Sequence, residues 1–238
     1  MKITTVLFDL DGTLLPMDQD TFVKAYFQGL CKKMLPYGYD PKALVDGIWA
    51  GTAAMVKNDG SCKNEEAFWN VFASVLGEEI RQRIPDFDAF YQTDFQKVQS
   101  VCGFESKAKQ VIKLVKELGL TPVLATNPLF PAVATHSRIR WAGLKTEDFR
   151  YITTYENCTY CKPNPDYYRQ ILDTLGLDPQ ECVMVGNDAT EDLAAMELGI
   201  PVFILTDCLI NKKDIDLSPY PHGSYPELMD FIRSLKES

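Results

Sequence analysis

Two aspartates near the start of the chain, Asp9 and Asp11, are separated by one residue, and a pair of carboxylates at this spacing could take part in catalysis or bind a cation. They follow the apolar run 3–7, which predicts a buried strand, and Gly12 and Thr13 then end that run. If the strand continues through the aspartates, its period of two directs both carboxylates to the same side. Two such charges about 4 Å apart repel by roughly 4 kcal/mol at an effective dielectric constant of 20. The pair therefore predicts a bound cation or a protonated carboxyl. A carboxylate pair that caps a turn is the structural alternative.

Two further polar positions lie next to expected elements. Thr126 and Asn127 end the apolar run 120–125. A hydroxyl and a backbone amide at the end of a strand can hold a phosphoryl oxygen, although Thr-Asn-Pro is also a favourable turn. Lys162 stands in the pattern Lys-Pro-x-Pro-x-x-Tyr, whose prolines fix its approach to the start of a helix. Its ammonium can neutralise an anion there, whereas most lysines are solvated surface residues.

An acidic segment follows the apolar run 181–185 and reads Gly-Asn-Asp-Ala-Thr-Glu-Asp over residues 186–192. Asp188 and Asp192 are one helical turn apart and share a face if this segment is helical. The dipole of a helix favours acids at its N-terminus, but this explains one of the two and not both. An oxygen-only ligand set with few protein ligands suits Mg²⁺.

Apolar runs and helical patterns alternate through the second half of the chain. Strands are expected at 120–125, 151–154, 181–185 and 202–205, and helices at 105–118, 131–142, before Gly176, before Gly199 and at 225–235. This alternation predicts an α/β fold with a doubly wound parallel sheet. In such sheets ligands bind at the carboxyl ends of the strands, where the polar residues described above fall.

Residues 17–97 interrupt this order with helical patterns alone. Phe22, Tyr26 and Leu30 form one apolar face, and Asn64 is expected to cap a later helix. The block is far longer than the roughly 10–12 residues that a strand-to-strand crossover requires, so it predicts an inserted domain. We expect a core of residues 1–16 and 98–238 and a helical domain of residues 17–97. The polar loop 57–63 is either a specificity element or a plain connection.

The composition excludes several classes of function. The net charge of −9 argues against nucleic-acid binding and against a polybasic contact with a membrane. The sequence has no apolar run of the length of a membrane span and no secretory signal, and its seven cysteines are scattered and odd in number. We therefore expect a cytoplasmic protein with reduced thiols. Cys158 and Cys161 form one C-x-x-C pair, for which a redox role is the alternative interpretation.

The four polar segments together resemble the four motifs of the haloacid dehalogenase superfamily of phosphohydrolases, each at the end of a core strand. The resemblance covers the whole core and implies a Rossmann-like fold. It implies that Asp9 is the nucleophile, that Asp11 is the general acid and base, and that Lys162 and Thr126 complete the catalytic set. It also implies phosphate binding and metal binding at these positions: Gly12, Thr13, Thr126, Asn127 and Lys162 for the substrate; Asp9, the backbone carbonyl of Asp11, and Asp188 for Mg²⁺.

The fourth motif departs from the family at one position. Asn187 stands just after the glycine, where relatives often carry aspartate, and Asp188 supplies a carboxylate instead. We therefore assign supporting roles at the metal to Asn187 and Asp192, with Asp192 either holding a metal-bound water or orienting Lys162.

The inserted block resembles the C1-type helical cap of one branch of the superfamily. The resemblance implies a Mg²⁺-dependent phosphatase that hydrolyses a small phosphorylated metabolite through an aspartyl-phosphate. A phosphomutase on the same scaffold and a catalytically silent phospholigand-binding protein are the alternatives. Dehalogenase and phosphonate-cleaving branches fit less well, because they lack an acid at the position of Asp11.

Overall fold

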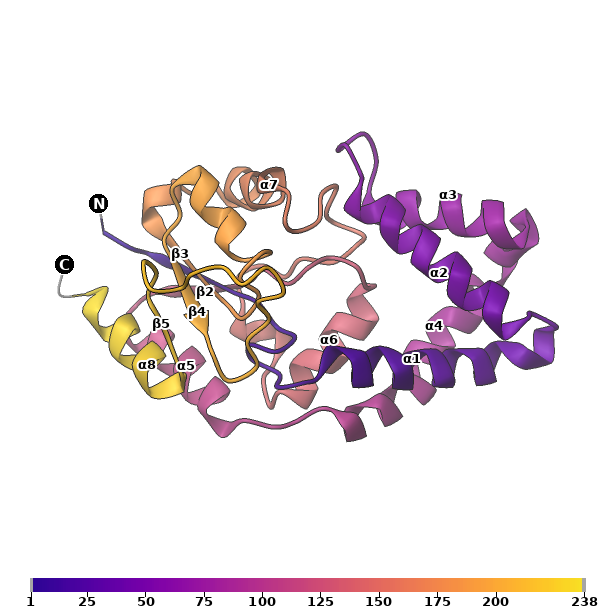
Figure 1. Ribbon diagram of the computed structural model, residues 1–238, viewed down its shortest axis with the longest axis horizontal. Helices are drawn as coiled ribbons and strands as arrows, with labels where there is room; N and C mark the ends of the chain where they lie inside the picture. Colours follow the sequence, from indigo (N-terminus) through magenta and orange to yellow (C-terminus); the bar gives the residue numbers. More distant parts are fainter. Residues whose placement is uncertain (1, 237–238) are drawn as a thin grey trace.

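The structure, a computed structural model, describes residues 2–236. Its centre is a parallel sheet with the strand order β2-β1-β3-β4-β5 (Figure 1). The strands are β1 (Thr5–Phe8), β2 (Thr121–Leu124), β3 (Cys182–Gly186), β4 (Val202–Leu205) and β5 (His222–Gly223). Every neighbouring pair is parallel, with Phe8 of β1 opposite Leu124 of β2 and Val185 of β3. The α/β class expected from the alternating pattern is confirmed.

Helices cover both faces of the sheet, as the period of two in its strands requires. Leu7 faces the layer of α7 (Pro165–Leu175) and the short 3₁₀ helix η6 (Leu193–Leu198). Its neighbours Val6 and Phe8 face the opposite layer, which includes α5, α6 and α8. The bounds of these helices are Ser106–Glu117 for α5, Ala132–Trp141 for α6 and Tyr225–Ser234 for α8. Both faces of the sheet are therefore buried, and functional side chains can reach a ligand only at the ends of the strands.

Residues 19–92 form the helices α1, α2, α3 and α4, beyond the carboxyl ends of the strands (Figure 1). They span Gln19–Met34, Pro41–Val56, Asn64–Leu76 and Ile84–Gln92. Shorter 3₁₀ turns link them and other elements: η1 (Leu35–Tyr37), η2 (Glu78–Arg83), η3 (Asp94–Val101), η4 (Thr146–Asp148) and η5 (Pro179–Glu181). Aromatic side chains pack this block on the core: the ring centroids of Tyr26 and Phe130 are 5.4 Å apart, and those of Phe95 and Trp141 are 5.0 Å apart.

The two chain segments that join the helical block to the sheet lie side by side. The backbone amide of Gly103 donates to the carbonyl of Pro16 at 2.7 Å. The expected boundary between residues 97 and 98 falls inside η3, so the chain enters the core within a turn of helix. A division into a core and a cap remains a prediction, and these adjacent segments are where a hinge between them would lie.

The polar loop 57–63 contacts the core directly. The ammonium of Lys63 donates to the carbonyl of Asn157 at 3.0 Å, and the hydroxyl of Tyr160 donates to the carbonyl of Asp59 at 3.2 Å. None of the residues of this loop lines the cleft above Asp9. The loop thus connects the helical block to the segment before Lys162, which is a structural role.

Three local expectations from the sequence are wrong. Residues 151–154 make a single bridge between Ile152 and Leu124 rather than a strand, because the side chain of Asn157 accepts from the amide of Thr154 and turns the chain. The helix expected before Gly199 is reduced to η6. Asn64 is the first residue of α3 and not its cap.

The side chain of Asn64 points inward instead of capping the helix. It accepts a hydrogen bond from Asn58 at 2.9 Å and donates to the carbonyl of Tyr160 at 3.2 Å. Asn64 is fully buried, so these bonds satisfy an amide that would otherwise be costly to bury.

Candidate active site

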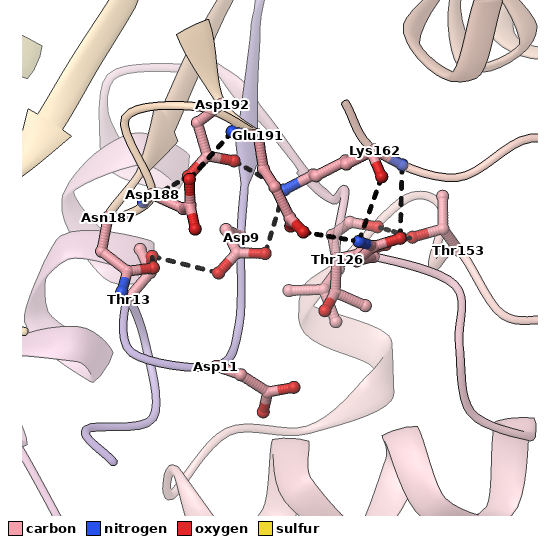
Figure 2. Close-up of polar contacts among 12 residues, drawn as sticks. Asp9, Asp11, Thr13, Thr126, Thr153, Lys162, Asn187, Asp188, Glu191 and Asp192 are labelled. Carbon is pink, nitrogen blue, oxygen red and sulfur yellow. Dashed lines mark hydrogen bonds and ion pairs between the residues drawn. The ribbon is translucent and has the colours of Figure 1, made fainter. Parts of the chain in front are cut away.

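Asp9 follows β1 directly and lies at the carboxyl edge of the sheet. Its amide donates to the carbonyl of Val185 on β3 at 2.9 Å, which fixes the backbone. Its carboxylate accepts from the ammonium of Lys162 at 3.0 Å and from the hydroxyl of Thr13 at 3.2 Å (Figure 2). Asp9 is 7% exposed, and burial raises its pKa to about 7, against the lowering effect of the Lys162 charge. A buried carboxylate held from both sides presents its oxygens in a fixed position.

Lys162 lies between two carboxylates and is almost completely buried. Its ammonium is 3.0 Å from Asp9 and 2.7 Å from Asp192. Burial alone would lower the pKa of Lys162, but the charges of Asp192 and Asp9 outweigh burial and raise this pKa well above its ordinary value. The ammonium is therefore charged, and Asp192 orients it. Of the two roles considered for Asp192, this contact supports the second.

The acidic segment after β3 folds back on itself. Asp188 accepts from the amides of Thr190 and Glu191 at 2.7 and 2.9 Å, and Asp192 accepts from the amide of Asp188 at 2.9 Å. These bonds explain why a tight turn replaces the first turn of a helix. A side chain on Gly186 would collide with the carboxylate of Asp192, so only glycine fits there.

Asn187 joins the first and fourth motifs. Its amide oxygen accepts from the hydroxyl of Thr13 at 3.0 Å, and its amide nitrogen donates to the carbonyl of Cys208 at 2.7 Å. A carboxylate at this position could not make the second bond, because an ionised carboxylate has no hydrogen to donate. The departure from the family pattern thus has a structural use in this chain.

Thr126 and Asn127 follow β2 and face the same centre. The carbonyl of Thr126 accepts from the hydroxyls of Tyr167 and Thr153 at 2.9 and 2.7 Å. The side chain of Asn127 accepts from the amide of Lys162 at 3.2 Å. The structure therefore brings residues of all four sequence segments together at one edge of the sheet (Figure 2).

Asp11 does not point the same way as Asp9, contrary to the expectation from strand geometry. β1 ends at Phe8, and the amides of Thr13 and Leu15 both donate to the carbonyl of Leu10, so the chain turns away from the strand direction at Leu10, before Asp11. The carboxylate of Asp11 is directed away from that of Asp9 (Figure 2) and forms an ion pair with Arg138 of α6.

Arg138 was not identified from the sequence. It is 1% exposed, and its guanidinium lies 4.4 Å from the ring centroid of Phe130. Burial raises the pKa of Asp11 above its ordinary value, and the charge of Arg138 opposes this shift. The one feature of the sequence that could have indicated Arg138 is that its two neighbours, Ser137 and Ile139, are small or apolar, which is typical of a buried position.

Glu191 is a second residue that the sequence did not single out. Its carboxyl group accepts from the side chain of Asn127 at 3.0 Å, within the cleft that contains Asp9. Burial raises the pKa of Glu191 to about 8; Lys162 lowers it, whereas the nearby acids Asp192 and Asp188 raise it. The adjacent acids Glu191 and Asp192 are the signal in the sequence, and helical spacing from Asp188 favours only Asp192.

The donors fit a magnesium ion. The carboxyl groups of Asp9, Asp188, Glu191 and Asp192 gather near the single ammonium of Lys162, so the site offers more carboxyl oxygens than this one cation can pair with (Figure 2). Among residues 2–236, no three His, Cys, Asp or Glu side chains converge as a complete metal cage. Mg²⁺ usually binds through one or two carboxylates and keeps waters and substrate phosphate as its other ligands. Asp9, the carbonyl of Asp11, and Asp188 therefore remain the predicted ligands.

The C-x-x-C pair does not have the properties of a redox centre. All seven cysteines are free thiols, and Cys158 and Cys161 are both buried. Burial raises the pKa of Cys158 to about 12 and that of Cys161 as well. Reactive thiols have lowered pKa values, so this pair packs as small apolar side chains.

The cleft above Asp9 is formed by both parts of the chain. It has a volume of about 210 Å³, and its walls include Gln19 and Phe22 of α1 and Trp49 of α2. The opposite wall consists of the core residues around Asp9, Thr126 and Glu191. The helical block therefore covers the carboxylate of Asp9 and supplies part of its surroundings.

Glu191 makes the stability of the metal-free protein depend on pH. The folded state holds this proton up to about pH 8, while the unfolded chain releases it near 4.5, so the free energy of unfolding falls as pH rises across that interval. Glu191→Gln keeps the acceptor for Asn127 and removes the titration. In EDTA we expect the variant to melt about 4 °C or more above the wild type at pH 8.5, and at the same temperature at pH 4.5. Glu197→Gln, an exposed change, is the control, and equal melting curves for all three proteins at pH 8.5 would contradict the assignment.

Arg138 stabilises the fold mainly through Asp11. We expect Arg138→Met to lower the free energy of unfolding by about 3–5 kcal/mol, because the Asp11 charge is left buried without a partner. The loss should shrink by at least about 1.5 kcal/mol in an Asp11→Asn background. Urea denaturation at pH 7.5 measures this double-mutant cycle, with exposed Arg140→Met as the control. An equal loss in both backgrounds would show that packing on Phe130, rather than the ion pair, carries the effect.

Comparison with known proteins identifies the family. The sequence model of haloacid dehalogenase-like hydrolases matches residues 3–199. The chain is 27% identical to a glyceraldehyde 3-phosphate phosphatase of Methanocaldococcus jannaschii over 99% of both chains. It is 26% identical to a phosphoglycolate phosphatase of Vibrio vulnificus, over 97% of this chain and 96% of the relative.

Solved structures show the same fold. A 2-haloacid dehalogenase of Pseudomonas syringae superposes with a TM-score of 0.64 at 16% identity, over 98% of both chains. A haloacid dehalogenase-type phosphatase of Thermococcus onnurineus gives a TM-score of 0.58 at 17% identity, over 97% of this chain and 98% of that structure. The resemblance found in the four motifs is thereby confirmed, and the chain belongs to the haloacid dehalogenase-like hydrolases.

Proposed function

We propose that the protein is a Mg²⁺-dependent phosphatase that hydrolyses a small phosphomonoester through an aspartyl-phosphate on Asp9. The observation that carries the proposal is the buried contact of Asp9 with Lys162, whose ammonium Asp192 holds in place. A carboxylate in this setting can attack an electrophile, and the fixed cation offsets the charge of an incoming phosphoryl group. The named phosphatases among the relatives support the same class of reaction.

The proposed reaction has two steps. An oxygen of Asp9 bonds to phosphorus while the ester P–O bond breaks, and the leaving oxygen takes a proton from Asp11. Water then attacks the phosphorus of the aspartyl-phosphate and gives a proton to Asp11, which releases phosphate and restores Asp9. Mg²⁺, when bound, neutralises charge on Asp9 and on the phosphoryl oxygens. Asn127 and Thr126 would hold the phosphoryl group beside Lys162.

Asp11 must change position to take part. It is paired with Arg138 and directed away from Asp9, whereas a general acid has to reach the leaving oxygen within hydrogen-bond distance. Asp11 already lines the cleft above Asp9, so rotation of its side chain out of this ion pair would turn the acid toward the leaving oxygen. We infer that the covering helices and the adjacent segments at Pro16 and Gly103 form a cap and its hinge, whose closure excludes water.

We infer that the substrate is a small phosphorylated metabolite. No helix among residues 2–236 is both long and apolar enough to cross a membrane. We infer a cytoplasmic location from the seven free thiols, which suit a reducing compartment. The presence of an acid at Asp11 favours phosphate ester chemistry over dehalogenation, although dehalogenases share the fold.

A panel of phosphomonoesters tests the proposal. We expect phosphate release that requires Mg²⁺, is lost in EDTA and returns on adding Mg²⁺. Asp9→Asn should abolish release while the protein stays folded, and Asp11→Asn should lose most activity, about 100-fold or more, and accumulate the phosphoenzyme. Near-wild-type activity of Asp9→Asn would contradict covalent catalysis. Isomerisation of a sugar phosphate without phosphate release would favour a phosphomutase.

A further inference from the structure

A second cavity lies directly beside the cleft above Asp9. It has a volume of about 130 Å³ and is enclosed by α1 to α4 on one side and by core residues 129–131 and 155 on the other. Val23, Trp49, Leu129 and Phe130 line both this cavity and the cleft. A group bonded to phosphorus at Asp9 therefore has this second cavity as its neighbouring space. We call it the aromatic pocket.

The walls of the aromatic pocket are made mostly of aromatic rings. Nine of its lining residues are aromatic: Tyr26, Phe27, Trp49, Phe68, Trp69, Phe87, Tyr91, Phe130 and Tyr155. The hydroxyls of Tyr26 and Tyr91 bond to each other at 3.0 Å, which satisfies the polar ends of these two rings. An apolar cavity of roughly 150 Å³ in another protein stays dry and binds benzene. The aromatic pocket is close to that size.

The described lining of the pocket contains no cationic side chain that could pair with an anion. Among the described residues that line it, Asp88 is the only one with a charged side chain, and Asp88 lies exposed at the rim. Glu156 lies near enough to Asp88 to help raise the pKa of that carboxyl. A substrate that carries a second negative charge would meet this acidic rim and would have to bury its charge among aromatic rings, which is unfavourable.

We propose that the aromatic pocket receives the leaving group of the substrate, and that the preferred substrate is the phosphate ester of an uncharged, apolar alcohol of about the size of benzene. This assignment rests on the proposed phosphatase function and names its substrate class. It departs from the relatives, whose names refer to phosphoglycolate and glyceraldehyde 3-phosphate. The exposure of Trp49 supports the proposal, because a large apolar side chain at 51% exposure stands where the leaving group would cover it.

The test compares three esters with the full-length enzyme and Mg²⁺: benzyl phosphate, methyl phosphate and 2-phosphoglycolate. Benzyl and methyl esters release alcohols of similar acidity, so the difference between their kcat/KM values reports the binding of the ring. We expect kcat/KM for benzyl phosphate to exceed both other values by at least about 10-fold, the discrimination typical of an apolar pocket. A preference for 2-phosphoglycolate would overturn the proposal.

A variant that fills the pocket locates the effect. Thr52 lines the aromatic pocket, and Ala53 is an exposed neighbour on the same helix. We expect Thr52→Leu to lower the ratio of benzyl to methyl kcat/KM by about 10-fold, mainly through KM, while Ala53→Leu leaves the ratio unchanged. An unchanged ratio in Thr52→Leu would overturn the pocket assignment. A preference for phosphocholine that Asp88→Asn abolishes would replace the uncharged leaving group with a cation.

A binding measurement separates failure of this assignment from failure of the proposed function. Benzylphosphonate cannot be hydrolysed, and Trp49 is one of three tryptophans in the chain. Trp49 and Trp69 both line the aromatic pocket. We expect benzylphosphonate to change the fluorescence of the wild type more than methylphosphonate does, and the double variant Trp49→Phe/Trp69→Phe to lose most of the change. If no ester is hydrolysed and this change is still seen, the phosphatase proposal fails and the pocket stands. Hydrolysis without any such change would overturn the pocket.

Discussion

The burial of one ammonium group between two carboxylates is the interaction on which the site depends. Removing Lys162, Asp9 and Asp192 from water is costly for each, and only their mutual attraction at 2.7–3.0 Å makes the arrangement tenable. Asp9 directly follows β1, Asp192 lies in the turn after β3, and Lys162 precedes α7, which packs on the sheet. The sheet and this helix therefore supply the rigidity that the ion pairs need. Gly186 and the turn of residues 186–192 then leave room for the carboxylate of Asp192.

A second ion pair, between Asp11 and Arg138, divides the site into two regions. Asp9 faces the sheet edge and the ammonium, while Asp11 is directed toward α6 and away from the other carboxylate. The two acids therefore avoid the repulsion that a shared direction would cause. Both acids still line the same cleft, and the aromatic pocket lies beside that cleft on the side of the helical block.

The sequence predicted the strands and the four motifs well, because apolar runs and their polar ends follow directly from burial in a parallel sheet. It predicted secondary structure less well where a side chain makes a hydrogen bond to the backbone of a nearby residue. Asn157 turned the expected strand at 151–154 into one bridge, and Asp188 shortened the helix that follows it. Arg138 and Glu191 escaped notice because their importance comes from partners far away in the sequence, Asp11 and Asn127. The direction of Asp11 depends on the turn that begins at Leu10, which no pattern of polarity in the sequence reveals.

The central claim is that Asp9 carries the phosphoryl group during turnover. The most direct measurement is to mix the wild-type enzyme with Mg²⁺ and a hydrolysed ester, quench within the first turnover, reduce with borohydride and sequence the peptides by mass spectrometry. An acyl phosphate is reduced to an alcohol, so the account predicts homoserine at position 9 and unmodified aspartate at position 11. Unmodified Asp9 in a sample that has released phosphate, or modification at another residue, would contradict it.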